Sequence, residues 1–466
     1  MKILLFGTGD YYRKYKSWFK QEEIIGLIDN DETKQGTLID GYKVYLPCEA
    51  AGLLYDCVAI LSVHEETMRK QLIELGVPEN KIYKFSELYK HPEIVMADQP
   101  VVLWGNERVF SRITMNDQPE TILIMSHNLD YNGASLVLFY LAQILIKSGF
   151  SIFFASWSDG VLRKHLYEKN IPTIIDPNLQ MRTQKEVEWT HGFHRIICNT
   201  LNYYQFLSDR NLKDKIIWWL HDPEVFYKSL DQELLQRVKE DDLYVCAVGP
   251  IAEKAFKTHF PFFEVKQLLY GIPDVSFNKL PHKKLSFVTI GNVQEYKGQD
   301  ILIQALKQLD EKVLEQIQVK IIGFQPSVYA NAVKKSAEGL GNVVEFIPPV
   351  DREEIHRVLE KTDVMICPSR ADSMPVVVNE AMQHCLVCII SDATGNAAYV
   401  EDGKNGLIVK QGDVKALAEK IRWCVECRDK LEEMGKAARK IYEQYFSIEV
   451  FEKNLLRIVR EAFYED

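Results

Sequence analysis

The amino-acid sequence predicts an α/β protein built from parallel sheets that are covered by helices, and three observations lead to this prediction. Short runs rich in β-branched residues alternate with helical patterns along the whole chain, which is typical of parallel strands joined by crossover helices. The chain has 466 residues, more than one ordinary domain contains. Its apolar fraction of 47% and its charged fraction of 26% are those of a folded globular protein.

The first predicted domain covers residues 1–117 and begins with a small dinucleotide-fold pattern. A strand at its start leads into Gly7-Thr8-Gly9, and a second strand ends at Asp29. This fingerprint for dinucleotide binding is weak, because Tyr12 stands where a third glycine is usual. A nucleotide site and a scaffold without a ligand therefore both remain open. The apolar run at residues 101–104 is expected to close this domain ahead of a linker.

The second and third predicted domains cover residues 118–280 and 281–466. Each repeats the alternation of strand and helix, starting with a strand at residues 121–126 in the second domain and at 285–290 in the third. The polar segment 271–284, which contains glycine and proline, predicts a hinge between the two domains.

The charge and the hydropathy pattern exclude several kinds of partner. The formal net charge of −10 argues against a nucleic-acid partner, because phosphate binding needs a basic face. No apolar run approaches the roughly 20 residues that a membrane span requires. The apolar stretch at residues 3–6 is short and ends in a glycine turn, unlike a signal peptide. We therefore expect a cytoplasmic protein.

Cysteine and histidine spacings offer two candidate metal sites. The C-x-x-C pairs at residues 385–388 and 424–427 lie in helix and strand patterns, not in the tight turns of zinc knuckles. We expect buried free thiols there rather than zinc. His191 and His194 also have metal-like spacing, but their neighbours supply no further ligand, so we expect them at the surface.

The densest chemical signal lies at residues 369–382, just after a predicted strand and at the start of a helix. A helix N-terminus at the carboxyl edge of a parallel sheet can bind a diphosphate through its free backbone N–H groups. Pro375 suits the first helical position. Asp372 precedes the helix and Glu380 lies inside it, so the two acids can contact different parts of one ligand. The backbone expected to face this ligand belongs to Ser373, Met374, Pro375 and Val376.

A second signal follows the first strand of the third domain. There Gly291 and Asn292 precede Lys297 and Gly298. A lysine just past the end of a strand, with flexible glycines around it, can place a cation on a phosphate. A departing nucleoside diphosphate gains negative charge in the transition state, so a fixed ammonium group would contribute to the rate as well as to binding.

Together these segments resemble the large family of retaining glycosyltransferases with the GT-B fold (family 4, the "group 1" transferases), from about residue 121 to the C-terminus. The E-x₇-E motif of that family corresponds to Asp372-x₇-Glu380. The resemblance implies that Asp372 and the backbone after it hold the donor sugar and diphosphate. It also implies that Glu380 binds the ribose hydroxyls.

The G-R-x₄-K-G motif of the family matches at Gly291, Lys297 and Gly298, and Lys297 would take the charge of the leaving diphosphate. Asn292 replaces the arginine of the motif, which removes one phosphate charge. A second departure is Ala398, which stands where a glutamate is usual.

The resemblance extends to the second domain. Gly133 and Ala134 correspond to the glycine-rich loop that lets the backbone approach the reacting centre. His221 matches a histidine–acid step after a strand and would touch the donor sugar. His127 and Asn128 are weaker candidates for the same cleft. In this fold the C-terminal helix packs back onto the second domain.

The leading segment, residues 2–82, is similar to the small Rossmann-like domain that precedes sugar acyltransferase domains in bacteria. The whole chain would then have the GT-B architecture of two facing Rossmann-like domains, preceded by a small additional one.

The resemblance implies a retaining transferase that moves a sugar from a nucleotide-diphosphate sugar to a glycan or lipid-linked acceptor in bacterial cell-surface polysaccharide or glycoconjugate biosynthesis. It implies no cofactor and no essential metal, because Lys297 and the helix N-terminus stabilise the departing charge. Peripheral contact with the inner face of the plasma membrane would suit such an acceptor. Two alternatives remain open: a nucleotide-sugar epimerase or hydrolase on the same fold, and a nucleotide-sugar-binding subunit without activity, which Asn292 and Ala398 suggest.

Overall fold

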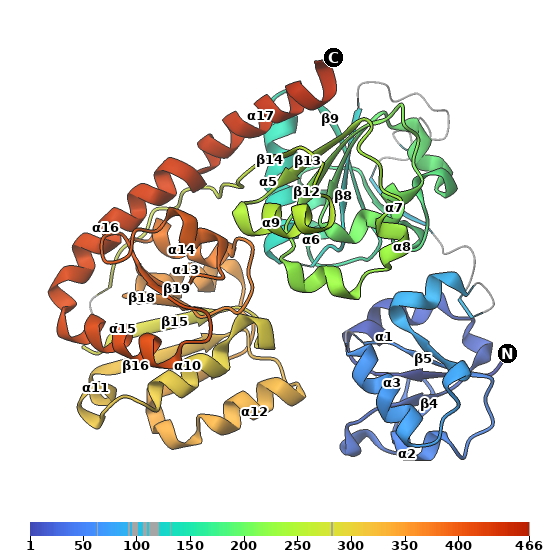
Figure 1. Ribbon diagram of the computed structural model, residues 1–466, viewed down its shortest axis with the longest axis horizontal. Helices are drawn as coiled ribbons and strands as arrows, with labels where there is room; N and C mark the ends of the chain where they lie inside the picture. Colours follow the sequence, from blue (N-terminus) through green and yellow to red (C-terminus); the bar gives the residue numbers. More distant parts are fainter. Residues whose placement is uncertain are drawn as a thin grey trace.

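The computed structural model describes residues 1–62, 64–91, 94–95, 101–105, 110, 121–130, 132–280 and 283–465. It confirms the predicted fold class, because the described strands form three separate sheets with helices packed around them (Figure 1). The predicted domain boundaries, between residues 117 and 118 and between 280 and 281, touch residues outside this described part of the chain.

The first domain holds a six-stranded sheet in the order β3-β4-β2-β1-β5-β6, parallel except for the β3–β4 pair. The four residues of β1 are fully buried, as expected of the central strand of a covered sheet. The elements are β1 (Ile3–Phe6), α1 (Asp10–Tyr15), β2 (Ile24–Ile28), β3 (Leu38–Ile39), β4 (Tyr42–Tyr45), α2 (Pro47–Ala50), β5 (Cys57–Ile60), α3 (Glu65–Glu74), β6 (Ile82–Lys84) and η5 (Phe85–Lys90).

The second domain holds an eight-stranded sheet in the order β14-β13-β12-β11-β8-β9-β10-β7. Its strands are β7 (Val102–Trp104), β8 (Thr121–Ser126), β9 (Ser151–Ser156), β10 (Thr173–Ile175), β11 (Arg195–Asn199), β12 (Lys215–Leu220), β13 (Leu243–Ala247) and β14 (Val265–Gln267). The main helices are α5 (Gly133–Lys147), α6 (Leu162–Glu168), α7 (Tyr204–Ser208), α8 (Gln232–Leu235) and α9 (Pro250–His259), with the short helix η10 (Glu224–Ser229) after β12.

Strand β7 corrects one prediction. The apolar run at residues 101–104 was expected to close the first domain, but β7 pairs antiparallel with β10 at the edge of the second sheet. The guanidinium of Arg163, on α6, lies 3.8 Å from the centre of the Trp104 ring and helps to hold this edge strand. An apolar run predicts a strand but not the sheet that it joins.

The third domain holds a six-stranded parallel sheet in the order β17-β16-β15-β18-β19-β20. Its strands are β15 (Leu285–Ile290), β16 (Ile317–Ile322), β17 (Val344–Ile347), β18 (Val364–Cys367), β19 (Val387–Ser391) and β20 (Leu407–Val409). Its helices are α10 (Gln299–Leu306), α11 (Glu311–Gln316), α12 (Val328–Ser336), α13 (Arg352–Glu360), α14 (Val376–Gln383), α15 (Val414–Glu426), α16 (Leu431–Ile441) and α17 (Ile448–Tyr464).

The C-terminal helix α17 leaves the third domain and runs along the second, as the red ribbon in Figure 1 shows. The ring of Phe451 stacks on Trp219 at 5.6 Å, and the Tyr244 hydroxyl donates to Glu461 at 2.6 Å. One continuous buried apolar cluster therefore joins the second and third domains. This helix ties the two domains together on one side. We call the junction of the carboxyl edges of their sheets, where Gly133 lies against Val376, the crevice.

The cysteines of the two C-x-x-C pairs are free thiols; Cys388 and Cys424 are buried, whereas Cys385 and Cys427 are half-buried. Within the described ranges, no group of three or more His, Cys, Asp or Glu side chains is arranged to hold a metal ion. None of the described helices is both long enough and apolar enough to cross a bilayer.

Candidate active site

The crevice of the third domain lies where its strand order reverses. Strands β15 and β18 are neighbours, and the chain proceeds from them toward opposite edges of the sheet. Ligands of open α/β sheets bind at the carboxyl ends of the strands at such a reversal. The loop that carries Lys297 follows β15, and the loop that carries Asp372 follows β18. The topology therefore brings together two segments that lie 75 residues apart in the sequence.

Lys297 and Asp372 form an ion pair in this crevice. The Lys297 ammonium donates to Asp372 Oδ2 at 2.6 Å, and it lies 5.3 Å from the centre of the Tyr296 ring. Burial lowers the pKa of Lys297, but the negative charge of Asp372 outweighs burial and holds that pKa above its usual value. The ammonium group therefore stays charged at the carboxyl edge of the sheet.

Helix α14 begins beside this ion pair. Pro375 is its N-cap and not the first helical residue, because its ψ of 122° is still extended; the helix starts one residue later than expected, at Val376. The first N–H groups of a helix have no acceptor inside the helix. They are the donors that a diphosphate at this N-terminus would use.

The loop before α14 is held rigidly by its neighbours. Gly395 N donates to Asp372 O at 2.9 Å, and Ser391 Oγ donates to Ser369 O at 2.5 Å. A Cβ atom on Gly395 would lie 1.6 Å from the carbonyl oxygen of Ser373, so only glycine fits there. The Ser373 hydroxyl is buried and makes no hydrogen bond within the described structure, so it can serve a ligand.

The second domain reaches this helix N-terminus through its glycine loop. A Cβ atom on Gly133 would lie 3.0 Å from Val376 Cγ2, so the glycine permits close approach of the two domains. The next carbonyl, Ala134 O, accepts a hydrogen bond from Asn199 Nδ2 at 3.1 Å. The Tyr270 hydroxyl donates to Met374 O at 2.5 Å. Gly133 thus lies against Val376 at the start of α14, and Tyr270 lies against Met374.

His221 follows β12 on the second-domain side of the crevice. Its ring lies 4.6 Å from that of Trp219. Burial, and then the neighbouring His127, lower the pKa of His221 to about 3, so the imidazole is neutral near pH 7. Its Nε2 atom is buried without a hydrogen-bond partner in the described structure. No hydrogen bond, ion pair or ring contact among the described residues joins His221 to Lys297 or Asp372.

Asp222 anchors the loop that carries His221. Its Oδ2 atom accepts from the Leu201 amide at 2.6 Å, and Leu201 follows the neighbouring strand β11. Burial raises the pKa of Asp222 to about 6, although backbone hydrogen bonds from Leu201 and His221 oppose this rise. The aspartate of the His–Asp step therefore has a structural role that fixes the histidine at the strand end.

Glu380 is 1% exposed and forms an ion pair with Arg352, the first residue of α13. The sequence analysis missed Arg352, because an arginine at a helix start after Pro348, Pro349 and Asp351 looks like any solvated residue. Only the fold shows that it lies against a buried carboxylate.

The remaining motif residues line the same loop. Gly291 has a φ of 138°, and a Cβ atom on Gly323 would lie 2.5 Å from Gly291 O, so the two strand ends pack closely. Asn292 is exposed, and its carbonyl accepts from Gln299 at 3.0 Å. Arg370 does not replace the missing arginine charge, because both of its terminal nitrogens bind Asp300 at 2.7 Å.

The weaker candidates have other partners. The side-chain oxygen of Asn128 accepts from Asp130 N, Asn132 and Ser135 and shapes its own loop. The ring of His127 faces Trp157 at 6.1 Å. The two spaced histidines bind locally: His191 to Gln184 O at 3.1 Å, and His194 to Asp214 at 3.0 Å.

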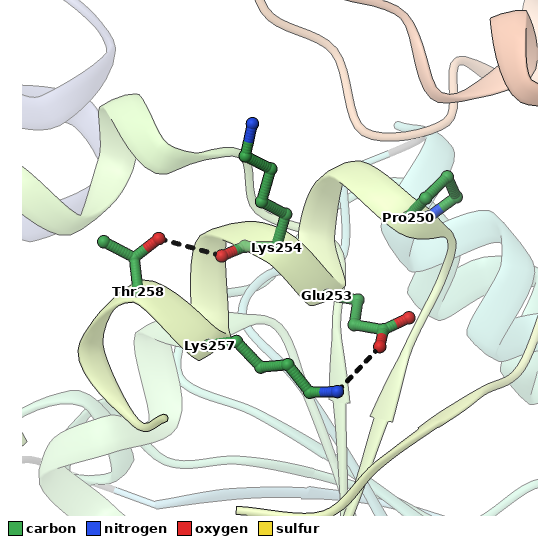
Figure 2. A pocket seen from close by; sticks show the side chains of 5 residues that line it. All are labelled: Pro250, Glu253, Lys254, Lys257 and Thr258. Carbon is green, nitrogen blue, oxygen red and sulfur yellow. Dashed lines mark hydrogen bonds and ion pairs between the residues drawn. The ribbon is translucent and has the colours of Figure 1, made fainter. Parts of the chain in front are cut away.

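A hollow of about 470 Å³ on helix α9 lies outside this group of residues (Figure 2). Glu253 and Lys257, one turn apart, form an ion pair of 3.0 Å across it. Lys254 points away from that pair, and none of the predicted site residues lines the hollow. We therefore do not assign it to the site.

Three family models match segments of this chain. Residues 118–244 match the model described as "Glycosyl-transferase family 4", and residues 274–441 match "Glycosyl transferases group 1". Residues 1–83 match "C2185-like, N-terminal", so the additional N-terminal domain has its own known relatives.

Two curated relatives show the same likeness. Spore coat protein SA of Bacillus subtilis is 31% identical over 185 residues, which are 38% of this chain and 49% of that protein. D-rhamnosyltransferase WbpZ of Pseudomonas aeruginosa is 30% identical over 188 residues, which are 38% of this chain and 47% of the relative. The chain thus spans about half the length of the curated relatives it matches.

Among solved structures, that of Anabaena Alr3699/HepE in complex with UDP-glucose superimposes with a TM-score of 0.63 at 19% identity. The match covers 73% of this chain and 99% of that one. At this identity the likeness is one of fold, and it extends over both domains that flank the crevice.

Proposed function

Because the chain belongs to the group 1 glycosyl transferases of family 4, we propose that it transfers a sugar from a nucleoside-diphosphate sugar to an acceptor bound in the crevice between the second and third domains. The observation that carries this proposal is the pairing of Lys297 with Asp372 at the N-terminus of α14. A cation and a helix N-terminus aimed at one place suit a diphosphate leaving group.

Each group has a separate role in this proposal. Lys297 and the first amides of α14 bind the diphosphate and stabilise the charge that grows on it as the sugar leaves. Asp372 orients the ammonium and accepts hydrogen bonds from the hydroxyls of the donor sugar. Glu380 binds the ribose. Neutral His221 hydrogen-bonds to the sugar from the opposite side once the crevice closes around the donor.

The sugar is transferred with retention of the anomeric configuration, as the family motif implies, and no divalent metal is required. This second point rests on Lys297 and the helix N-terminus, which together replace the charge that a metal would supply. Addition of EDTA should leave turnover unchanged.

The acceptor in this proposal is a glycan or lipid-linked sugar that reaches the enzyme at the inner face of the membrane. This acceptor class is what the family resemblance implies, and the relative named as a D-rhamnosyltransferase supports the transfer of a sugar.

The donor is tested by measuring the melting temperature with a panel of UDP, GDP, ADP and dTDP sugars, and then turnover with those that bind. A ligand at 100 times its dissociation constant should add about 2.7 kcal/mol of stability. Asp372→Asn should lower turnover about 100-fold or more. Asp429→Asn, an exposed control in the same domain, should leave turnover unchanged.

The same panel separates the alternatives. Release of free sugar with no preference for a glycan acceptor would indicate a hydrolase, and an epimerised donor would indicate an epimerase. Binding without any turnover would favour a non-catalytic subunit. The absence of any stabilisation by all of these ligands would reject the donor site.

A further inference from the structure

A buried ion pair lies deeper in the crevice, one to two turns along α14. Glu380 is 1% exposed, and the guanidinium of Arg352, whose side chain is 20% exposed, contacts one of its carboxylate oxygens. Burying a carboxylate without a counter-charge is costly, so this contact stabilises the ionised form of Glu380.

Arg352 is positioned by the start of α13 and by Tyr140 as well as by Glu380. It is the first residue of α13, whose N-cap Asp351 accepts from the Glu354 amide at 2.8 Å. Its guanidinium also lies 6.0 Å from the centre of the Tyr140 ring, on α5 of the second domain. The arginine therefore joins α13, α14 and the opposite domain.

Three titratable neighbours of the pair, His356, His384 and Tyr270, carry no positive charge near pH 7. Burial, then Arg352 and His384, lower the pKa of His356 to about 4, and burial lowers the pKa of His384. Burial raises the pKa of Tyr270 well above its usual value, so this phenol is uncharged. Among the described residues, Arg352 is thus the cation that faces the Glu380 carboxylate.

We propose that Arg352 is a positioning residue, which holds the Glu380 carboxylate in the orientation that accepts hydrogen bonds from the 2′- and 3′-hydroxyls of the donor nucleotide. This inference rests on the proposed function, in which Glu380 binds the ribose. It makes recognition of the ribose depend on a side chain outside the E-x₇-E motif, on a helix that also contacts the second domain.

A pH profile distinguishes this role from a purely structural one. Burial already raises the pKa of Glu380, and Arg352 opposes that rise. Without the arginine, Glu380 is protonated up to a higher pH, and a protonated carboxyl accepts fewer hydrogen bonds from a diol. Arg352→Met should therefore gain affinity for the nucleotide as pH rises, and this gain should extend to a higher pH than any pH dependence of the wild type.

The test is a calorimetric titration with UDP, GDP or ADP, whichever the wild type binds, and with its 2′-deoxy analogue. The wild type should bind the ribonucleotide about tenfold more tightly than the analogue, which is the size of one hydrogen bond to a charged group. Arg352→Met should lose this preference and bind the ribonucleotide about tenfold more weakly. Arg352→Lys, which keeps the charge but not the fork, should fall between them.

Arg357→Met is the matched control, because Arg357 lies on the same helix with its side chain 60% exposed. It should behave as the wild type. Equal binding by Arg352→Met and Arg357→Met would overturn the inference while leaving the proposed function standing. Tighter binding by Arg352→Met would also overturn it, since the arginine would then compete with the ribose. A wild type that binds no nucleoside diphosphate would reject the proposed function itself.

Melting temperatures of the variants show whether each is folded. If Arg352→Met does not fold, Arg352→Lys still tests the inference.

Discussion

The protonation states of single residues in the crevice depend on burial as much as on residue type. Burial and the nearby His127 keep His221 neutral, whereas Asp372 keeps Lys297 charged. A neutral imidazole can hydrogen-bond to a sugar hydroxyl without attracting the diphosphate. A charged ammonium group attracts the diphosphate. The two sides of the crevice are thus suited to different parts of one donor.

The low pKa of His221 predicts how stability depends on pH. An unfolded histidine has a pKa near 6.5, and that of His221 in the fold is about 3. A lowered pKa contributes stability that is complete above pH 6.5 and is lost as pH falls toward 3. Asp222 acts in the opposite sense, since its raised pKa of about 6 favours the fold at low pH. A variant changed only at His221 keeps Asp222, so comparison with it cancels the contribution of Asp222.

The melting temperature of the wild type should therefore fall faster between pH 7 and pH 5 than that of His221→Gln, which has no group to ionise. The measurement is a thermal denaturation series of both proteins in matched buffers. Parallel curves would show that His221 titrates normally and is not buried as described.

At this scale, site residues that belong to a family motif could be predicted from the sequence. A residue that joins the site only through a contact in the fold could not. Lys297, Asp372 and Glu380 stand out in the sequence because their spacing matches a family pattern. Arg352 has no such spacing, and its role depends on α13 lying beside α14. The predicted contact of His221 with the donor sugar stays a prediction.

At the scale of elements, the start of α14 depends on a backbone contact from another loop. Gly395 is not next to any predicted catalytic residue in the sequence, yet its Cα lies against the carbonyl of Ser373. Nothing in the sequence indicates that this glycine supports the donor loop. In the same way, the apolar run at residues 101–104 was expected to close the first domain, but it pairs with β10 of the second sheet.

Gly395→Ala should displace the loop before α14, because the new Cβ would meet backbone atoms that cannot move aside as a side chain can. We expect nucleotide binding to weaken by at least about tenfold, corresponding to 1.4 kcal/mol or more. Gly339→Ala is the control, since a Cβ there meets nothing within 4 Å. Calorimetry with the preferred nucleoside diphosphate makes the comparison. Unchanged binding by Gly395→Ala would show that the loop tolerates displacement.

At the scale of the whole molecule, the first domain packs against the carboxyl edge of the second sheet. One buried apolar cluster includes residues from both domains. Tyr15, on α1, is 7% exposed, and its hydroxyl is within hydrogen-bond reach of Trp157 and Gln180, which follow β9 and β10. Trp157 in turn faces His127, the neighbour of His221. The additional domain is therefore joined to the side of the crevice that carries His221.

The wild type should consequently unfold its first and second domains in one transition. Tyr15→Ala removes a large buried ring and should lower stability by about 3–5 kcal/mol, and separate the two transitions. Leu38→Ala, 70% exposed in the same domain, is the control and should change little. Differential scanning calorimetry resolves the number of transitions. A single unshifted transition in Tyr15→Ala would contradict the described interface.

The account depends most on Lys297 and the N-terminus of α14 sharing one diphosphate. Titration of the preferred nucleoside diphosphate into wild type, Lys297→Met and the exposed control Lys307→Met tests this directly. We predict that Lys297→Met weakens binding by at least about tenfold, because it removes a charge-assisted hydrogen bond, and that Lys307→Met does not. Equal affinity of Lys297→Met and the wild type would contradict the account.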